Sequence, residues 1–432
     1  MAIRRAAVTL GLVTLLLVQA AAQNGNATWV SWAHANHYPV STVQSLDGDT
    51  FADLQFFRTV LQDRRIVQLG ESGHGVAEFN HAKVRLIKFL HEQLGYDVIA
   101  FESGLYECYA ANQNAALTAV MLMRSCIFGV WHTNEVLPLF EYIKATQGTA
   151  HPLTLAGFDT QISSSLGIAS RPQLFADLVR IVDPSRAAQT ATTDQQHISG
   201  VSTAGSRYAT ANEPRLTEFY GGLELLFQEH RAALQQALPG TELPKVGERA
   251  AYSMLRYLEQ LRAGLGARPD PAETGGAIRD FGMANNLSFL ADDLYRDRKI
   301  MVWAHNFHIR HDNAATTSIQ PTMGQRIRER FRDQLYTIGL YMDQGTAAQN
   351  NRVVYSISPG PANSMEWVMA NTATPILFMD FLHQSRSDGN SWMFQSTLQR
   401  DWGVNPFTMI PRNQYDGVLF INSVKPPSYL TF

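Results

Sequence analysis

With 432 residues, of which 45% are hydrophobic, the chain could fold as one large α/β domain or as two smaller domains. Its 35 basic and 38 acidic residues leave a formal net charge of −3, and the two signs are interspersed along the chain. Because no basic stripe is visible, we predict that nucleic acid is not a partner.

The first segment, residues 1–22, is predicted to be a secretory signal peptide. Arg4 and Arg5 precede an apolar stretch over residues 6–18, and Ala-Ala-Ala-Gln at 20–23 resembles a processing site. The apolar stretch is too short to span a bilayer well. A transmembrane anchor is the alternative, but no stop-transfer pattern follows. We therefore expect a secreted or periplasmic protein with no membrane partner after cleavage.

Residues 23–164 are predicted to form the first part of an α/β core. An irregular lead-in precedes residues 51–63, which have helical spacing, and a β-branched run at 66–69 then predicts the first strand. This strand ends at a Gly-rich turn, GESGHG, which carries Glu71, Ser72 and His74. Ser72 has the position of a nucleophile on a strand-to-helix turn, but the G-x-S-x-G spacing is absent, so we expect it to line the turn or cap the next helix.

An amphipathic helix is predicted after the turn. Its apolar residues repeat at intervals of three and four, and they are Phe79, Ala82, Leu86, Phe89, Leu90 and Leu94. Lys83 and Arg85 are expected off this apolar face, and Gly95 is expected to cap the C-terminus. Apolar runs then end at Glu102 and Asp159. The only cysteines, Cys108 and Cys126, could form a disulfide in an oxidising compartment or remain buried thiols.

Residues 165–275 are predicted to be a helical insertion, because long helical patterns replace the strands there. We expect the polar, low-complexity stretch at 190–206 to be mobile. The core is predicted to resume over residues 276–432, where a helical pattern leads to a strand that ends at His305. Further strands are predicted at 335–341, 375–380 and 417–423. The expected fold class is therefore α/β, with a mostly parallel sheet flanked by helices and an inserted all-helical subdomain.

Polar side chains end four of these strand-like runs: His74, Glu102, Asp159 and His305. Parallel strands joined by right-handed crossovers place their carboxyl ends on one sheet edge, where open α/β sheets bind ligands. A single histidine there would more often be an ordinary loop residue, but four polar ends indicate a shared site. Imidazole is suited to take a proton from water, and a carboxylate, Glu102 or Glu71, is suited to orient it.

Two further features bear on this site. Arg279 lies on a predicted helix and could hold a carboxylate or an oxyanion, or else form a structural ion pair with Asp280. His305, His308 and His311, with His74 and the carboxylates, could supply ligands for zinc or manganese. The chain has no H-E-x-x-H or comparable compact ligand set, so we predict no metal and no cofactor.

Five segments of the chain resemble the erythromycin esterase family in order and spacing. They are GESGHGVAEFNHAKVRLIKFLHEQLGYDVIAFESG at 70–104, GFD at 157–159, RDFGMANN at 279–286, WAHNFHI at 303–309 and YDGVLFI at 415–421. The resemblance spans roughly residues 50–424. It implies an α/β core with a parallel sheet and an all-helical subdomain, and hydrolysis of a macrolide lactone by water without a required metal.

The resemblance also implies roles for individual residues. The general-base histidine of the family matches His74, its supporting glutamate matches Glu102, and its active-site arginine matches Arg279. The second active-site histidine matches His305, and His308 closes the same motif. A further acidic position matches Glu78. The turn has Glu-Ser-Gly-His where the resistance enzymes of the family have Glu-Ala-Thr-His or Glu-Gly-Thr-His.

We therefore predict an exported hydrolase that opens a small-molecule ester or lactone. In this prediction His74 is the general base, Glu102 orients it, and Arg279 and His305 polarise the acyl oxygen. The residues predicted to contact substrate are Glu71, Glu78, Asp159 and His308. The alternatives are a metal-dependent hydrolase or peptidase that uses the same cluster, and a non-catalytic secreted binding protein that retains the fold.

Overall fold

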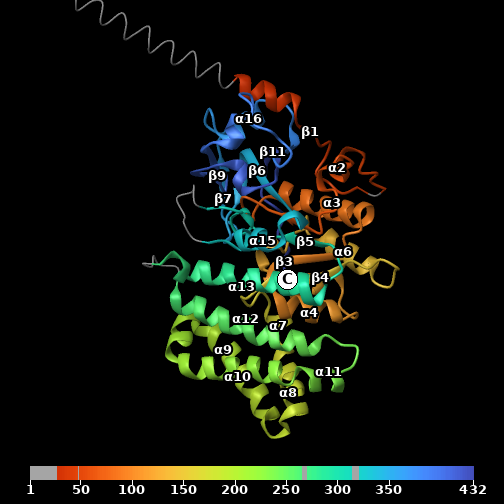
Figure 1. The fold of residues 1–432 in the computed structure, drawn as a ribbon, viewed down its shortest axis with the longest axis vertical. Coiled ribbons are helices and arrows are strands. Elements are labelled where there is room, and N and C mark those ends of the chain that lie inside the picture. Colours follow the sequence, from red (N-terminus) through yellow and green to blue (C-terminus); the bar gives the residue numbers. More distant parts are fainter. Residues whose placement is uncertain (1–26, 47, 265–269, 314–320) are drawn as a thin grey trace, which may run out of the picture.

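The computed structural model describes residues 27–46, 48–264, 270–313 and 321–432, so the predicted signal peptide lies outside the described residues. A nine-stranded sheet runs through the molecule (Figure 1). In spatial order its strands are β1 (Tyr38–Pro39), β8 (Ile376–Asp380), β11 (Gly417–Val424), β6 (Leu335–Ala348), β2 (Ile66–Leu69), β5 (Ile300–Trp303), β3 (Val98–Gly104) and β4 (Thr154–Asp159), with β7 (Val354–Ile357) paired to β6.

The sheet is mostly parallel, as the sequence predicted. Strands β11, β6, β2, β5, β3 and β4 pair in parallel, whereas β1, β7 and β8 pair antiparallel to their neighbours. Each strand predicted from an apolar run is present. A separate antiparallel hairpin, β9 (Thr397–Asp401) with β10 (Asn405–Met409), has no counterpart in the sequence prediction.

Helices cover both faces of the sheet, and each face has its own apolar core. One face packs against α2 (Phe57–Leu61), α3 (Ala77–Leu94), α5 (Ala119–Cys126) and α6 (Leu137–Thr146). The other face packs against α13 (Gly275–Phe289), α15 (Met323–Phe331) and α16 (Met365–Ala370). Further α-helices are α4 (Leu105–Gln113), α14 (Asn306–Ile309) and α17 (Pro411–Gln414). The 3₁₀-helices are η1 (Ala52–Leu54), η2 (Gly129–Trp131), η3 (Pro184–Arg186), η4 (Pro271–Glu273), η6 (Arg332–Gln334) and η7 (Ser391–Phe394). Residues Leu290–Leu294 form a π-helix, η5.

Helix α3 follows the predicted apolar repeat and ends at the predicted cap, where Gly95 has φ 71° and donates its N–H to the Leu90 carbonyl. The expectation that Lys83 and Arg85 lie off the buried face is wrong, because both side chains are buried. Lys83 lies four residues after Phe79 and three before Leu86, which places it on the same face of the helix. Burial of these cations requires partners: Lys83 pairs with Glu71, and Arg85 pairs with two aspartates.

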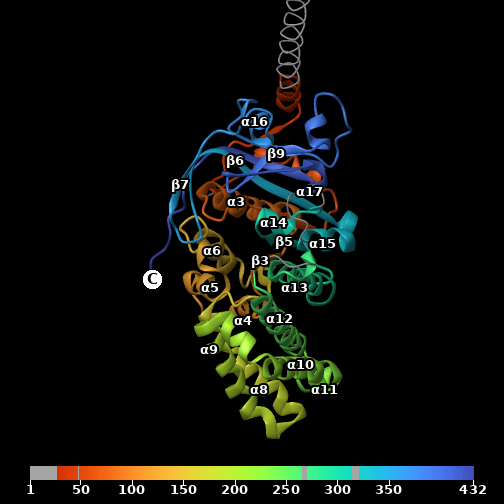
Figure 2. The same ribbon diagram turned by 90° about the vertical axis from the view of Figure 1, so that its left-hand side faces the viewer.

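Between β4 and β5 the described residues contain no strands. This segment begins with α7 (Ser165–Ile168), α8 (Arg171–Val182), α9 (Ala187–Ala211), α10 (Glu213–Glu229), α11 (Arg231–Ala237) and α12 (Leu243–Ala263), and it ends with α13 and η5. Figures 1 and 2 show α8 to α12 stacked beyond the β4 end of the sheet, away from β1. Among the described residues no helix is long and apolar enough to cross a bilayer.

The polar stretch at 190–206 is not a loop, because it lies within α9. Its buried residues recur at helical intervals and are Thr190, Asp194, His197, Ile198 and Val201. Asp194 accepts hydrogen bonds from Arg171 and from Tyr220, so a polar helix face packs against its neighbours through satisfied polar groups. The helix is kinked at Gly205, where φ is 50°.

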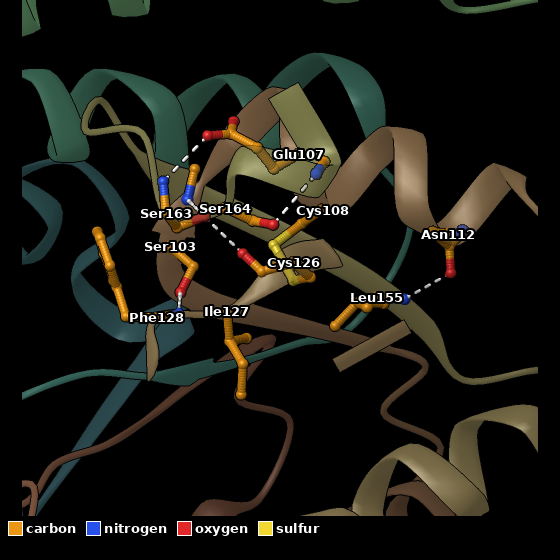
Figure 3. The surroundings of a disulfide bond; sticks show 12 residues. Ser103, Glu107, Cys108, Asn112, Cys126, Ile127, Phe128, Leu155, Ser163 and Ser164 are labelled. Atoms are coloured by element: carbon orange, nitrogen blue, oxygen red, sulfur yellow. Dashed lines mark hydrogen bonds between the residues drawn. A yellow bond between two sulfur atoms is a disulfide. The ribbon is translucent and has the colours of Figure 1, made fainter. Parts of the chain in front are cut away.

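Cys108 on α4 and Cys126 at the end of α5 form a disulfide (Figure 3). Their Cα atoms lie 4.2 Å apart. Ser163 ties the same region to the end of β4, because its hydroxyl donates to the Cys126 carbonyl and its backbone N–H donates to Glu107. The disulfide therefore links α4 to α5, two helices that follow β3.

Candidate active site

The four polar strand ends meet at the carboxyl edge of the parallel strands. His74 follows β2 and His305 follows β5, and their imidazole ring centres lie 5.1 Å apart. Glu102 is within β3 and Asp159 ends β4, and both accept hydrogen bonds from Arg279 on α13. Parallel pairing of β2, β5, β3 and β4 is what brings these residues to one edge.

His74 is oriented by Glu71, three residues before it in the same turn. His74 Nδ1 lies 2.5 Å from Glu71 Oε1, so the ring donates its Nδ1–H to the carboxylate and keeps Nε2 free to accept a proton. Trp131 donates its indole N–H to the same Glu71 oxygen at 2.8 Å. The other oxygen, Oε2, lies 2.5 Å from Lys83 Nζ. The Glu71 carboxylate therefore has three partners.

The charges behind His74 are fully buried. Burial by itself would raise the pKa of Glu71, but Lys83 and His74 lower it below the usual range. Burial lowers the pKa of Lys83 to about 8, against the attraction of Glu71. The Lys83 ammonium also lies 4.0 Å from the centre of the Trp303 ring. At neutral pH the pair is therefore ionic, and the carboxylate can stabilise an imidazolium on His74.

Backbone contacts fix the turn that carries His74. Gly75 forms an antiparallel bridge with Ala348 at the end of β6, and a Cβ atom on Gly75 would lie 2.0 Å from the Ala348 carbonyl oxygen. Ser72 donates its N–H to Leu340, also in β6, and accepts one from Trp402 in the β9–β10 turn. The turn is thus held from two sides, and only glycine fits at position 75.

A second cluster surrounds Arg279. Its Nε and Nη2 atoms donate to Asp159, and Nη2 also donates to Glu102 Oε1 at 2.7 Å. His308 lies against the same groups: its Nδ1 is 3.0 Å from Asp280, and its Nε2 is 3.3 Å from Glu102 Oε1. Glu102 Oε2 accepts the backbone N–H of His305 at 2.8 Å. This carboxylate therefore anchors the start of the His305–His308 segment.

The strand carrying Glu102 is irregular at that residue. Phe101 pairs with Gly157 and Gly104 pairs with Asp159, so β3 has one more residue than β4 between these pairs. Such a bulge re-aims a side chain at the end of a strand. Burial by itself would raise the pKa of Glu102, but His308 and Arg279 hold it well below the usual range. Glu102 is therefore ionised at neutral pH.

The pKa values of His305 and His308 are shifted in opposite directions. Burial would lower the pKa of His308, but Asp280 and Glu102 raise it to about 10. His305 has a pKa well below the usual range because of its burial and the nearby His74 and His308 rings. At neutral pH His308 is therefore cationic and His305 is neutral.

The tautomer of neutral His305 follows from its contacts. Its Nδ1 accepts the backbone N–H of Phe307 at 3.1 Å, so the ring hydrogen is on Nε2. Among the described residues, this buried Nε2 has no hydrogen-bond partner. The side chain thus presents an unused N–H beside His74, which is the arrangement needed to donate to a developing oxyanion.

The structure changes several predicted roles. Glu102 does not hydrogen-bond His74; it binds Arg279, His308 and the His305 backbone, and Glu71 takes the predicted orienting position. Glu71 and Asp159 are fully buried and engaged with protein partners, so the expectation that they contact substrate is replaced by positioning roles.

Other predicted residues lie apart from this chemistry. Glu78, on the first turn of α3, accepts the backbone N–H of Lys425 at 2.8 Å. The hydroxyl of Ser72 is buried and has no hydrogen-bond partner among the described residues, so Ser72 lines the turn and does not cap α3. His311 bonds Thr337 and lies against Arg328 rather than beside His305. Within the described part of the chain, no group of three or more His, Cys, Asp or Glu side chains is arranged to hold a metal ion.

Three contacts of the site were missed from the sequence: Lys83, Trp131 and Trp402. Lys83 left a detectable signal, because a charged residue at an apolar position of an amphipathic helix needs a buried partner. The centre of the Trp402 ring lies 5.5 Å from the centre of the His74 ring and 5.7 Å from that of His305. The centre of the Trp131 ring lies 5.1 Å from that of His74. Trp131 ends the 3₁₀-helix η2 and Trp402 lies in the β9–β10 turn, and neither segment was assigned to the sheet edge from the sequence.

Comparisons with known proteins agree with this architecture. The family model described as erythromycin esterase matches residues 91–424. "Putative hydrolase YbfO" of Bacillus subtilis (strain 168) is 34% identical over 419 residues, which cover 92% of this chain and 91% of that protein. "Erythromycin esterase type II" of Escherichia coli is 24% identical over 335 residues, 73% of this chain and 78% of that protein.

A solved structure of the erythromycin esterase EreC, a mutant in its open conformation, superimposes with a TM-score of 0.71 at 17% identity. The match covers 92% of this chain and 100% of that chain. At this identity the likeness concerns the fold, and it agrees with the predicted α/β class.

Proposed function

This chain is a hydrolase of the erythromycin esterase family, and from that premise we propose that it cleaves a carboxylic ester or lactone by His74-activated attack of water. The observation that carries the proposal is the hydrogen bond between His74 Nδ1 and Glu71 Oε1. This bond leaves Nε2 as the basic nitrogen, and the His74 side chain is 14% exposed, so water and substrate can reach it.

In the proposed reaction, His74 Nε2 takes a proton from water while the water oxygen attacks the acyl carbon. The carbonyl oxygen becomes an oxyanion, which accepts the Nε2–H of neutral His305. The tetrahedral intermediate then collapses, and the protonated His74 returns its proton to the departing alkoxide. Glu71 stabilises the imidazolium between these two steps. A lactone opens to a hydroxy acid, and an ester releases an acid and an alcohol.

Arg279 has a positioning role in this mechanism. Its Nε and Nη2 atoms are taken by Asp159 and Glu102, so we replace the predicted contact with the acyl oxygen by support of the Glu102 carboxylate. Glu102 in turn holds the backbone of His305 and the ring of His308. His308 is 12% exposed and remains the member of this cluster proposed to contact substrate.

The proposed substrate is a small molecule encountered outside the cytoplasm, because the N-terminal sequence has the features of an export signal. Two histidines, two tryptophans and the Arg279 cluster frame the reacting position. We propose that helices α8 to α12 set the size of the acceptable substrate from the β4 side of the sheet.

A hydrolysis screen tests the proposal. The full-length exported protein is incubated with a panel of carboxylic esters and lactones, with and without a chelator, and acid release is followed by titration. We expect turnover of at least one compound class that is unchanged by the chelator. Turnover that stops with the chelator and returns with zinc or manganese would favour the metal-dependent alternative. Absence of turnover across the panel would favour the non-catalytic binding protein.

A further inference from the structure

A hollow of about 430 Å³ is lined in part by Trp402. It is formed by the turn that joins β6 to β7 and by the β9–β10 hairpin. Its lining residues are Gln349, Asn350, Asn351, Tyr355, Trp402, Val404 and Asn405. The volume falls in the range of about 300 to 1,000 Å³ that is common for small-molecule sites.

The hollow and the catalytic histidines share a wall. Trp402 lines the hollow, and its ring also packs against both His74 and His305. The two segments that form the hollow are those that hold the catalytic turn, through the Gly75–Ala348 bridge and the bond from Trp402 N–H to the Ser72 carbonyl. Trp402 therefore borders both the reacting position and the hollow.

The lining has an unusual composition for a small-molecule site. Four of its side chains are carboxamides, one is a phenol, and none carries a formal charge. A carboxamide both donates and accepts, which matches a hydroxyl group that does the same. The indole and Val404 add apolar surface of the kind that accepts the C–H face of a saturated ring. The lining offers no opposite charge to a charged ligand.

We propose that this hollow is a subsite for a neutral, hydroxyl-rich group of the substrate, such as a hexose ring that carries the ester. The inference rests on the proposed function of the adjacent site and deepens it, because it names the class of alcohol that the hydrolase releases. Carboxamides from both turns, represented by Asn350 and Asn405, bind the hydroxyls, and the Trp402 indole packs against the ring.

A matched pair of acetate esters provides the kinetic test: methyl glucoside acetylated at its primary hydroxyl, and cyclohexylmethyl acetate. The acyl group is the same, and only the hydroxyl-rich character of the alcohol differs. For the double variant Asn350→Ala/Asn405→Ala we expect kcat/KM on the sugar ester to fall about tenfold through KM, the scale of one or two lost neutral hydrogen bonds. The rate on the cyclohexyl ester stays unchanged.

Gln113→Ala is the matched control, because Gln113 is an exposed carboxamide on α4 outside the hollow. It should leave both rates unchanged. Equal losses on the two esters in the double variant, or no loss on either, would overturn the subsite.

A binding measurement separates failure of the subsite from failure of the proposed chemistry. Saturation-transfer NMR is recorded with methyl glucoside, methyl galactoside and methyl mannoside on the wild-type protein and the double variant. Signal from a glycoside that disappears in the double variant supports the subsite even if neither acetate is hydrolysed. Absence of signal from all three glycosides overturns it, even if simple esters are hydrolysed.

Discussion

Each active-site histidine is fixed in one tautomer by a different kind of partner. A buried carboxylate holds the Nδ1–H of His74, which leaves a basic Nε2. A backbone N–H occupies Nδ1 of His305, which leaves a donor at Nε2. In the proposed mechanism, two side chains of the same type therefore supply a base and a hydrogen-bond donor, and their ring centres lie 5.1 Å apart. The difference between the two roles follows from the hydrogen-bond partner of each ring and not from the residue type.

The Glu71→Gln variant tests the orienting role of Glu71. Glutamine keeps the shape but cannot stabilise the imidazolium, so we expect kcat/KM to fall on the order of 10² to 10⁴-fold. The change also leaves Lys83 as an unpaired buried cation, which costs roughly 3 to 5 kcal/mol of unfolding free energy. Denaturant unfolding and ester hydrolysis are measured on the same preparations.

The double variant Glu71→Gln/Lys83→Met separates these two effects, because it removes both buried charges. We expect it to recover most of the lost stability while remaining as inactive as the single variant. Recovery of activity together with stability would show that Glu71 acts only through the fold.

His308 predicts a pH dependence of stability. Its pKa rises from 6.5 in the unfolded chain to about 10 in the fold, so the folded state binds the extra proton between these values. Its contribution is fully present below pH 6.5 and is lost as the pH rises through about 10. The excess stability of wild type over His308→Gln should therefore decline across this window in urea titrations. A constant difference would contradict the assignment of a cationic His308.

The polar strand ends were predictable because each lies at the end of an apolar run or in the turn that follows it, and parallel pairing brings such ends together. The partners of the catalytic groups were not. Glu71 and Glu102 are both carboxylates near His74 in the sequence pattern, and the choice between them depends on side-chain geometry at the turn and on the bulge in β3. Trp402 is more than 300 residues from His74 and reaches it only through the β9–β10 hairpin.

The catalytic turn depends on its attachment to strand β6. A methyl group at position 75 would collide with the Ala348 carbonyl, so we expect Gly75→Ala to displace the turn and lower kcat/KM at least about tenfold. The measurement is hydrolysis of the best substrate of the panel, with the folded fraction checked by circular dichroism.

Gly222→Ala in α10 is the control, since a Cβ atom there meets no heavy atom within 4 Å. Alanine in a helix should raise stability by up to about 1 kcal/mol and leave the rate unchanged. Equal activity of Gly75→Ala and Gly222→Ala would show that the bridge to β6 is dispensable.

Strands buried on both faces give long apolar runs, which is why β2, β3, β4, β5, β6, β8 and β11 were predictable. Strands β7, β9 and β10 are less completely buried and give no such run. The polar stretch within α9 was predicted to be mobile because its polar composition was given more weight than the helical spacing of its buried residues. Its buried residues follow helical spacing, but they are threonine, aspartate and histidine as well as aliphatic side chains.

Across the whole molecule, one edge of a continuous sheet collects groups that are distant in sequence. Residues 71, 102 and 159 precede helices α7 to α12 in the chain, and residues 279 and 305 follow them. Apolar side chains fill the cores on both faces of the sheet, and the clusters around Glu71 and Arg279 lie at its carboxyl edge. The resulting site is preorganised by the same packing that stabilises the fold.

The disulfide provides a test of how this region is stabilised. It joins cysteines separated by 18 residues, so its removal in Cys108→Ser/Cys126→Ser should cost about 3 kcal/mol of unfolding free energy. Reductant should lower the stability of wild type and leave the variant unchanged in urea titrations. Equal stability of wild type with and without reductant would contradict a disulfide in the folded protein.

The most direct test of the proposed chemistry is the rate of His74→Ala. On the ester or lactone that wild type hydrolyses fastest, we expect kcat/KM to fall by about 10³-fold or more, because the base that activates water is removed. The folded fraction should be unchanged, since the His74 side chain lies at the open end of the site. A folded His74→Ala protein that hydrolyses the same substrate at the wild-type rate would contradict the account.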